Sequence, residues 1–434
     1  ELPGSIQSIG VAAFRGCSCL AEIRVPDGVT TIQARAFGGC EKLSSVVLSS
    51  NTKYIGESAF EGCVRLTDID FEDLAFIGNR AFYGCVDLAD VVFSDVIESI
   101  GSSAFAGCTG LTDITIPKNI QSIGGSAFYG CTNLKNFVFA DDSQCTSIGE
   151  YAFNGCSGLT GITIPSTVKN IGLGAFANCS GLTSITLPFT GATADGTNNT
   201  HFGYIFGASG YSNNSKYIPS SLKKVVITGT KIGDYAFYRY EGLTDFTIPD
   251  NIESIGSHAF DGCTGLTSIT IPDSVKNIGL GAFANCSGLT SMTLPFVGAT
   301  ADSTDKTHFG YIFGASGYSD NNKYIPSSLK KVVITGTKIG DYAFYCYEGL
   351  TDFTIPDNIE SIGSHAFDGC TGLTSITVPS SVKTIGLGAF ANCSGLTSIT
   401  LPFTGATADG TDNTHFGYIF GASSYSNNSK YIPR

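Results

Sequence analysis

Residues 108–131 read Cys-Thr-Gly-Leu-Thr-Asp-Ile-Thr-Ile-Pro-Lys-Asn-Ile-Gln-Ser-Ile-Gly-Gly-Ser-Ala-Phe-Tyr-Gly-Cys. Within this stretch, Ile114 and Ile116 alternate with polar residues, a pattern that predicts a short strand with one buried face. Pro117 follows at once and ends the strand, because proline has no backbone N–H for a strand ladder. A strand this short needs neighbouring strands to be stable.

The second half of the stretch carries a different apolar pattern. Ile120 and Ile123 form a second apolar pair, and Gly124 then permits a tight bend. We expect Ala127 and Phe128 to turn inward after it, within one helical turn at most. The whole stretch therefore predicts one coil with a buried inner side.

The same coil recurs along the chain. Its Ala-Phe dipeptide is repeated at steps of 22, 23 or 25 residues, with two longer steps of 61, and its Phe falls at Phe14, Phe37, Phe60, Phe82, Phe105, Phe128, Phe153, Phe176, Phe237, Phe260, Phe283, Phe344, Phe367 and Phe390. Periods of this size are typical of stacked supersecondary units. One unit buries too little apolar surface to fold alone, so its stability must come from the coils on either side.

The strand leucines give the number of coils. They are Leu20, Leu43, Leu66, Leu88, Leu111, Leu134, Leu159, Leu182, Leu222, Leu243, Leu266, Leu289, Leu329, Leu350, Leu373 and Leu396. The sequence therefore predicts a β-rich solenoid of about 16 coils of about 23 residues, with short parallel strands and one-turn helical segments.

A longer period of 107 residues separates Phe176, Phe283 and Phe390. We interpret 1–434 as a single solenoid domain in which the coils of 1–164 are more diverged. Successive copies of a super-repeat follow at 165–271, 272–378 and 379–434, the last of them truncated. Each copy carries an extended coil, such as 189–218, which we expect to loop out without breaking the stack.

Composition and charge exclude several classes of protein. The 24 Lys and Arg against 37 Asp and Glu give a net charge of −13, without the basic face that a nucleic-acid-binding protein needs. No run approaches the 18 consecutive apolar residues of a membrane span. The chain begins at Glu1 without Met, so we expect any export signal or wall anchor to lie outside it.

Twelve of the 15 cysteines share one repeat position, namely Cys17, Cys40, Cys63, Cys85, Cys108, Cys131, Cys156, Cys179, Cys263, Cys286, Cys370 and Cys393. Stacked side chains would keep their Cβ atoms near the roughly 4.8 Å spacing of the coils, beyond the about 3.5–4.5 Å that a disulfide needs. Tyr240 and Tyr347 replace Cys at this position. We therefore predict a ladder of buried free thiols and no zinc site, since no Cys-x-x-Cys pair exists.

Other apparent motifs lose their meaning in this context. The run 172–177 fits a dinucleotide fingerprint but opens no long helix.

Histidines at equivalent positions are four coils, or about 19 Å, apart, so we interpret His201, His258, His308, His365 and His415 as loop anchors or solvent-facing residues. Asp195-Gly-Thr-Asn and Asp409-Gly-Thr-Asp resemble calcium loops, but the middle copy, Asp302-Ser-Thr-Asp, lacks the turn glycine. We predict no cofactor and no metal.

The outward strand positions form a regular surface of hydroxyl groups. The pairs are Ser184 and Thr186, Ser268 and Thr270, Ser291 and Thr293, Ser375 and Thr377, and Ser398 and Thr400. Threonine has a high propensity for exposed strands, and this alone explains its presence here. We therefore favour a structural interpretation of this surface over a role in ligand binding.

The extended coils carry the candidate binding residues. These are Tyr204, Phe206, Tyr211 and Tyr217, with their equivalents Tyr311, Phe313, Tyr318 and Tyr324. Aromatic residues interleaved with Asn, Ser and Gly are typical of adaptable binding loops. The sequence leaves two interpretations open, recognition of a partner or packing into the core, and Phe206 in particular could replace the missing Ala-Phe core residue.

The repeat resembles that of the BspA-like leucine-rich repeat family, which is marked by Leu-x-x-Ile-x-Ile-Pro and by Ile-Gly-x-x-Ala-Phe-x-Gly-Cys. Residues 266–272 and 278–286 match both halves in register, and the likeness covers essentially the whole chain. The resemblance implies a right-handed solenoid on secreted or cell-surface proteins, largely bacterial, some of which are adhesins for fibronectin or fibrinogen. The extended coils are not part of the minimal repeat.

We therefore expect a non-enzymatic surface or secreted protein that adheres to host matrix or surface proteins, or to glycans, through a repetitive surface. Two alternatives stay open. The chain could be a passive spacer that displays another domain, or the accessory region of a larger surface enzyme. The sequence does not give the oligomeric state.

Overall fold

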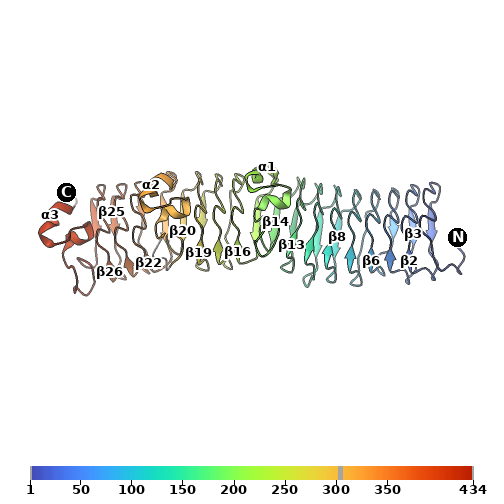
Figure 1. Cartoon of the computed structure of the whole chain (residues 1–434), viewed down its shortest axis with the longest axis horizontal. Coiled ribbons are helices and arrows are strands. Elements are labelled where there is room, and N and C mark those ends of the chain that lie inside the picture. The colour runs from blue at the N-terminus through green and yellow to red at the C-terminus, as the bar shows by residue number, and fades with distance from the viewer. Residues whose placement is uncertain (1, 302–305, 433–434) are drawn as a thin grey trace. The chain divides into compact units, whose positions relative to one another are not determined.

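The computed structural model describes residues 2–301 and 306–432 (Figure 1). The contacts divide the chain into two compact units, unit 1 (Glu1–Thr228) and unit 2 (Gly229–Arg434). Each unit is a stack of coils, and the two together contain the roughly 16 turns that the leucine count predicts. The predicted solenoid of short parallel strands is confirmed.

Each complete coil can contribute two strands, one more than the sequence pattern suggested. In unit 1 the Leu-x-x-Ile-x-Ile stretches form two parallel sheets. The first has three strands, β1 (Glu22–Arg24), β3 (Ser45–Val47) and β5 (Asp68–Ile69). The second has five strands, β8 (Asp113–Ile116), β10 (Asn136–Phe139), β12 (Gly161–Thr163), β14 (Ser184–Leu187) and β15 (Lys224–Ile227). The apolar pair before each glycine adds a seven-stranded parallel sheet of two-residue strands, β2 (Thr31–Ile32), β4 (Tyr54–Ile55), β6 (Phe76–Ile77), β7 (Ser99–Ile100), β9 (Ser122–Ile123), β11 (Ser147–Ile148) and β13 (Asn170–Ile171).

Unit 2 repeats this arrangement. One face carries β18 (Ser268–Thr270), β20 (Ser291–Leu294), β21 (Lys331–Ile334) and β23 (Asp352–Phe353), followed by β25 (Ser375–Thr377) and β27 (Ser398–Thr400). The other carries two three-stranded sheets, β16 (Lys231–Ile232), β17 (Ser254–Ile255) and β19 (Asn277–Ile278), and then β22 (Lys338–Ile339), β24 (Ser361–Ile362) and β26 (Thr384–Ile385).

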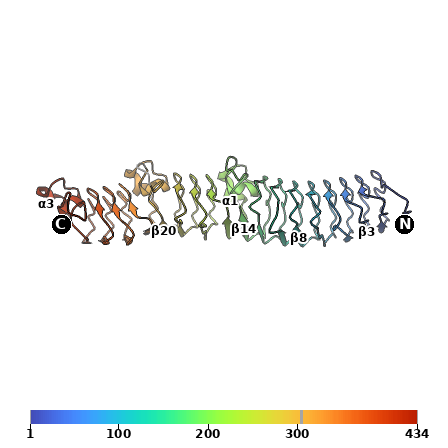
Figure 2. The same ribbon diagram turned by 90° about the horizontal axis from the view of Figure 1, so that it is seen from below.

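The inserted segments are helical and recur at intervals of 107 residues. The first contains η1 (Phe202–Phe206), η2 (Tyr211–Asn213) and α1 (Asn214–Tyr217), the second contains η3 (Phe309–Phe313), η4 (Tyr318–Asp320) and α2 (Asn321–Tyr324), and the third contains η5 (Phe416–Phe420), η6 (Tyr425–Asn427) and α3 (Asn428–Tyr431). In Figure 2 the segment around α2 stands out from the coils of unit 2.

The insertion affects the two sheets of unit 2 differently. On one face β20 and β21 pair in register across it, with Ser291 opposite Lys331 and Leu294 opposite Ile334. On the other face the sheet ends at β19, and a new one begins at β22. The expectation that the stack continues is therefore correct for one face only.

The corner that contains Ala127 and Phe128 is not helical. It is a run of hydrogen-bonded turns in which Ser126 and Gly130 have left-handed φ values of 53° and 70°. Its backbone N–H groups bond to the next coil, with Phe128 N donating to Ala152 O at 2.8 Å. This forms a further ladder between coils, and the one-turn helices lie in the inserted segments instead.

Gly124 also has a role other than the expected tight bend. A Cβ at this position would lie 2.6 Å from the backbone carbonyl carbon of Gly101 in the preceding coil. The glycine therefore permits the close approach of successive coils.

Ladders of identical side chains fill the core. In unit 1 the rings from Phe14 to Phe176 stack nearly parallel, with centroids 5.3 to 5.7 Å apart in successive coils. The strand leucine and the Ala-Phe pair of most coils are fully buried. Within the part of the chain that the structure describes, no helix has the length and apolar character needed to cross a membrane.

Candidate functional site

Phenylalanines attach each inserted segment to the core. Phe202 and Phe206 are buried, their rings meet edge to face at 5.1 Å, and Phe206 lies 6.5 Å from Phe176 of the ladder. Phe309 and Phe313 repeat this contact in the second copy. Phe206 and Phe313, both predicted as candidate binding residues, are each 1% exposed. An Ile-Phe pair takes the place of the missing Ala-Phe pair in each of these copies, since Phe176 N–H donates to Ile205 O and Phe283 N–H to Ile312 O. The rings of Phe206 and Phe313 are not accessible to a ligand.

A histidine and an asparagine hold the two ends of each segment together, and both are buried in the first two copies. His308 Nδ1 lies 3.0 Å from Asn321 Oδ1, which also accepts a hydrogen bond from Gly310 N–H at 2.8 Å. Since an amide oxygen only accepts, His308 must carry its proton on Nδ1. Asn321 Nδ2 donates to Tyr345 O of the next coil at 2.9 Å.

The same pairing occurs at His201 with Asn214 and at His415 with Asn428. His201 and His308 are each 4% exposed. Burial lowers their pKa below the usual value, so both are neutral at pH 7. The loop-anchor interpretation of these histidines is confirmed.

Tyr204, Tyr217 and their equivalents are partly covered. Tyr204 is half-buried beside His201, and burial raises its pKa. Tyr217 lies against Gly207, where a Cβ would be 3.6 Å from its ring, while Lys216 Nζ sits 5.5 Å from the ring centroid. Tyr217 and Tyr324 remain 38% and 39% exposed. Tyr311 is half-buried like Tyr204.

Tyr211 and Tyr318 project furthest among the eight predicted residues, each 42% exposed, and the third copy exposes Tyr425 by 80%. Tyr318 stacks on Tyr342 of the following coil at 4.1 Å and meets Tyr345 edge-on at 5.2 Å. Sequence reasoning missed Tyr342 and Tyr345. The signal in the sequence was that two tyrosines flank the Ala-Phe dipeptide after each of the first two insertions.

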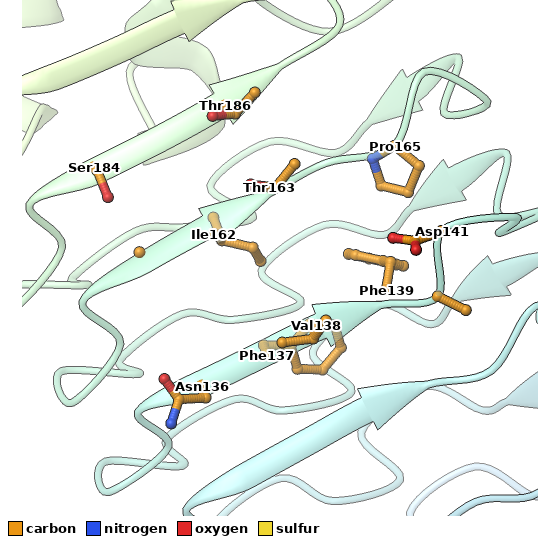
Figure 3. Close-up of a pocket in the computed structure, with 12 residues that line it drawn as sticks. Asn136, Phe137, Val138, Phe139, Asp141, Ile162, Thr163, Pro165, Ser184 and Thr186 are labelled. Carbon is orange, nitrogen blue, oxygen red and sulfur yellow. The ribbon is translucent and has the colours of Figure 1, made fainter.

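The Ser/Thr surface is present on the outward strand positions, and in unit 1 it contains a hollow (Figure 3). The hollow lies across β10, β12 and β14, has a volume of about 520 Å³, and is lined by Asn136, Val138, Thr163, Ser184 and Thr186 among others. Gly161 is one of its lining residues, and a Cβ there would lie 2.7 Å from Ser184 Oγ. Sequence reasoning missed this hollow as well. The signal in the sequence was Gly161, which stands at a position where the neighbouring strands carry Asn136 and Ser184.

The candidate calcium loops are closed by their own side chains. Asp195 Oδ1 accepts hydrogen bonds from the hydroxyls of Thr193 and Thr197, and Asp409 does the same for Thr407 and Thr411. The middle copy at 302–305 lies outside the described residues. Across the residues that the structure does describe, no group of three or more His, Cys, Asp or Glu could hold a metal ion.

The predicted ladder of buried free thiols is confirmed for eleven of its twelve members, and Cys17 in the first coil is exposed. Each thiol donates to the carbonyl of the ladder phenylalanine in the preceding coil, as Cys131 Sγ does to Phe105 O at 3.1 Å. Burial raises the pKa of Cys131 to about 12. Tyr347 fits the same position because its hydroxyl donates to Leu329 O.

Comparison with known proteins now identifies the family. The model of the BspA type leucine-rich repeat region matches residues 1–109, 75–197, 215–310 and 324–411. The chain belongs to the BspA-type leucine-rich repeat family. No catalytic family is indicated by the same comparison, and no curated protein sequence matches the chain.

Solved structures similar to this BspA-type chain come from several bacteria. A leucine-rich repeat protein from Bacteroides ovatus is 27% identical over 88% of this chain and 81% of its own, with a TM-score of 0.40. A leucine-rich cell surface protein from Faecalibacterium prausnitzii is 26% identical over 95% of this chain and 86% of its own, with a TM-score of 0.32. The pneumococcal vaccine antigen PcpA is 17% identical over 91% of this chain and 80% of its own, with a TM-score of 0.27.

Proposed function

We propose that this chain is a non-enzymatic interaction protein of the cell surface or of the secreted fraction, and that its inserted segments bind macromolecular partners. One observation carries the proposal: each copy of the segment is attached by the same Phe and His–Asn contacts, buried in the first two copies and part-buried in the third, and presents an exposed tyrosine at the same place, Tyr211, Tyr318 and Tyr425. An aromatic ring fixed in place before binding loses little conformational entropy when a partner docks on it.

Adhesion to a host matrix protein or to a glycan is the specific form of this proposal. A repeated site gains avidity when its partner is itself repetitive, which fits fibrous matrix proteins and polysaccharides. Family membership supports a role in molecular interaction at a bacterial surface, while the partner itself is proposed from the tyrosines.

Biosensor binding to immobilised fibronectin, fibrinogen and a glycan panel tests the proposal. The informative variant changes Tyr211, Tyr318 and Tyr425 to Ser. The matched control changes Tyr54, Tyr83 and Tyr129, tyrosines of ordinary coils that are 46%, 38% and 49% exposed. We expect saturable binding that survives high salt, weakens at least tenfold in the first variant and is unchanged in the control.

The opposite results are equally informative. Equal weakening in both variants would place the binding outside the inserted segments. If a folded protein binds nothing in the panel, the spacer interpretation replaces this proposal.

A further inference from the structure

Three rings form a stack in unit 2. Tyr318 lies 4.1 Å from Tyr342 with the ring planes 16° apart, and Tyr342 lies 5.2 Å from His365 with the planes 10° apart. Tyr342 and His365 occupy the same position in successive coils, each with a left-handed φ, of 55° and 53°. The stack ends on Gly388, where a Cβ would lie 2.8 Å from the His365 ring.

Hydrogen bonds fix the inner end of this stack. His365 Nδ1 donates to Asp368 Oδ2 at 2.8 Å, and the other oxygen of this buried carboxylate accepts from Asn392 Nδ2 at 2.8 Å. At the outer end, Tyr345 meets Tyr318 edge-on at 5.2 Å. Tyr318 is thus in contact with two other rings, and it is still 42% exposed.

The surroundings of the exposed ring are polar. From 316 to 324, the exposed side chains are Ser316, Tyr318, Ser319, Asn322, Lys323 and Tyr324, and no exposed aliphatic side chain lies among them. The segment therefore combines exposed aromatic surface with hydroxyl, amide and ammonium groups and with the half-buried carboxylate of Asp320.

We propose that Tyr318 is a stacking platform for a sugar ring, and that the partner bound by this segment is a glycan or polysaccharide. This inference rests on the proposed function and specifies its partner. A pyranose places C–H groups on its faces and hydroxyls around its rim. The C–H groups suit the electron-rich face of a tyrosine, and the hydroxyls suit the polar groups beside it.

A protein partner fits this surface less well. The centre of a protein interface is an extended apolar area, and specific interfaces bury about 800 Å² on each side. Here the exposed surface consists of Tyr318, Tyr324 and polar side chains, without an extended apolar area. The inner part of the stack also recurs at Tyr235 and His258, 5.1 Å apart with planes at 8°, and Tyr211 is exposed to the same extent as Tyr318. Repeated single-sugar sites suit a repetitive polysaccharide.

The absence of tryptophan from the chain gives a direct experiment. The Tyr318→Trp variant introduces one indole, whose fluorescence is followed during titration with cellohexaose, xylohexaose, mannohexaose and chondroitin sulfate. Tyr54→Trp is the matched control, because Tyr54 is 46% exposed and also stacks on a ring, that of Phe76 at 5.1 Å. We expect a saturable change with at least one of these saccharides for Tyr318→Trp and none for Tyr54→Trp.

Calorimetry on the responding saccharide then tests the stack itself. Loss of the ring in Tyr318→Ala should weaken binding about tenfold, as expected for one aromatic stacking contact. Tyr318→Phe keeps the ring and should bind within about threefold of the wild type. Tyr342→Ala removes the support under the ring and should lie between these two.

The outcomes separate this inference from the proposed function. Tyrosine-dependent binding to fibronectin or fibrinogen with no response to any of the saccharides would overturn the glycan inference and leave the proposed function standing. An equal response from Tyr54→Trp would overturn it as well, because binding would not depend on the stack. A folded protein that binds neither proteins nor saccharides would overturn both.

Discussion

In the coil around Phe128, the inward side chains stack on residues of the same kind in the coils before and after it, whereas the segment around His308 is held by contacts that occur once in each copy. Phe128 stacks on Phe105 and Phe153, and the thiols of Cys131 and Cys156 each donate to the carbonyl of the ladder phenylalanine in the preceding coil. The inserted segment instead depends on a buried imidazole and amide and on two phenylalanines. Each ordinary coil is therefore stabilised by contacts with the coils on both sides. The inserted segment is stabilised by a few contacts of its own, and it can open locally when these are broken.

The largest effect that distinguishes the two regions should appear at high pH, because only the ordinary coils carry the thiol ladder. Burial raises the pKa of Cys63, Cys131, Cys179, Cys286 and Cys393 from 9.0 to about 12. Between these values the unfolded chain releases protons that the folded chain keeps. The free energy of unfolding therefore falls as pH rises above 9.0, by about 1.4 kcal/mol per thiol and pH unit.

Those five thiols alone lower the free energy of unfolding by on the order of 7 kcal/mol per pH unit, and the ladder thiols whose pKa burial raises still further add to this slope. Urea denaturation under reducing conditions, repeated at several pH values, measures this slope. Cys131→Val removes one titrating group and should reduce the slope by about 1.4 kcal/mol per pH unit. A free energy of unfolding that stays constant from about pH 8 to about pH 11 would contradict the assignment of neutral buried thiols.

A smaller effect should follow from filling the space between two ordinary coils. In Gly124→Ala the new methyl group would lie 2.6 Å from the carbonyl carbon and 2.7 Å from the oxygen of Gly101, and neither backbone atom can move without disturbing the ladder. We expect a loss of about 3 kcal/mol or more in the free energy of unfolding. Gly10→Ala is the control, since nothing lies within 4 Å of its Cβ position. Similar stabilities for the two variants would show that the coils can separate at no cost.

The ordinary coils were predictable because their pattern repeats. Alternating apolar residues locate the strands, and the common position of the cysteines predicts a ladder of thiols too far apart for disulfides. The pattern does not distinguish Gly124 as a bend from Gly124 as a point of close approach, since both require the absence of a side chain. The second strand of each coil was missed because it is only two residues long.

The inserted segments were less predictable because their contacts are formed between residues of unrelated pattern. The sequence showed the aromatic residues but not which of them are buried, and so Phe206 stood beside Tyr211 as a candidate. The support of Tyr318 by Tyr342 depends on how the chain returns to the stack after the insertion, which no local pattern contains. The pairing of His308 with Asn321 is likewise a tertiary contact.

The smallest of the three effects should occur in acid and only in the inserted segment. Burial lowers the pKa of His308 below its unfolded value of 6.5, while nearby Asp320 acts in the opposite direction with a smaller effect. Below pH 6.5 the unfolded segment therefore binds a proton that the folded segment excludes, and its stability falls as pH decreases toward the folded pKa. A protonated imidazole would also remain beside the proton-donating amide of Gly310.

Hydrogen exchange of residues 308–325, corrected for the intrinsic effect of pH, measures this local opening. We expect protection of this segment to decrease between about pH 7.5 and about pH 5, while the ordinary coil at 111–131, which contains no histidine, stays protected. His308→Asn is the matched variant, because its side-chain amide can donate to Asn321 Oδ1 from nearly the same place as Nδ1 but does not titrate. Its protection should be independent of pH over this range. An equal decrease in wild type and variant would show that a group other than His308 opens the segment.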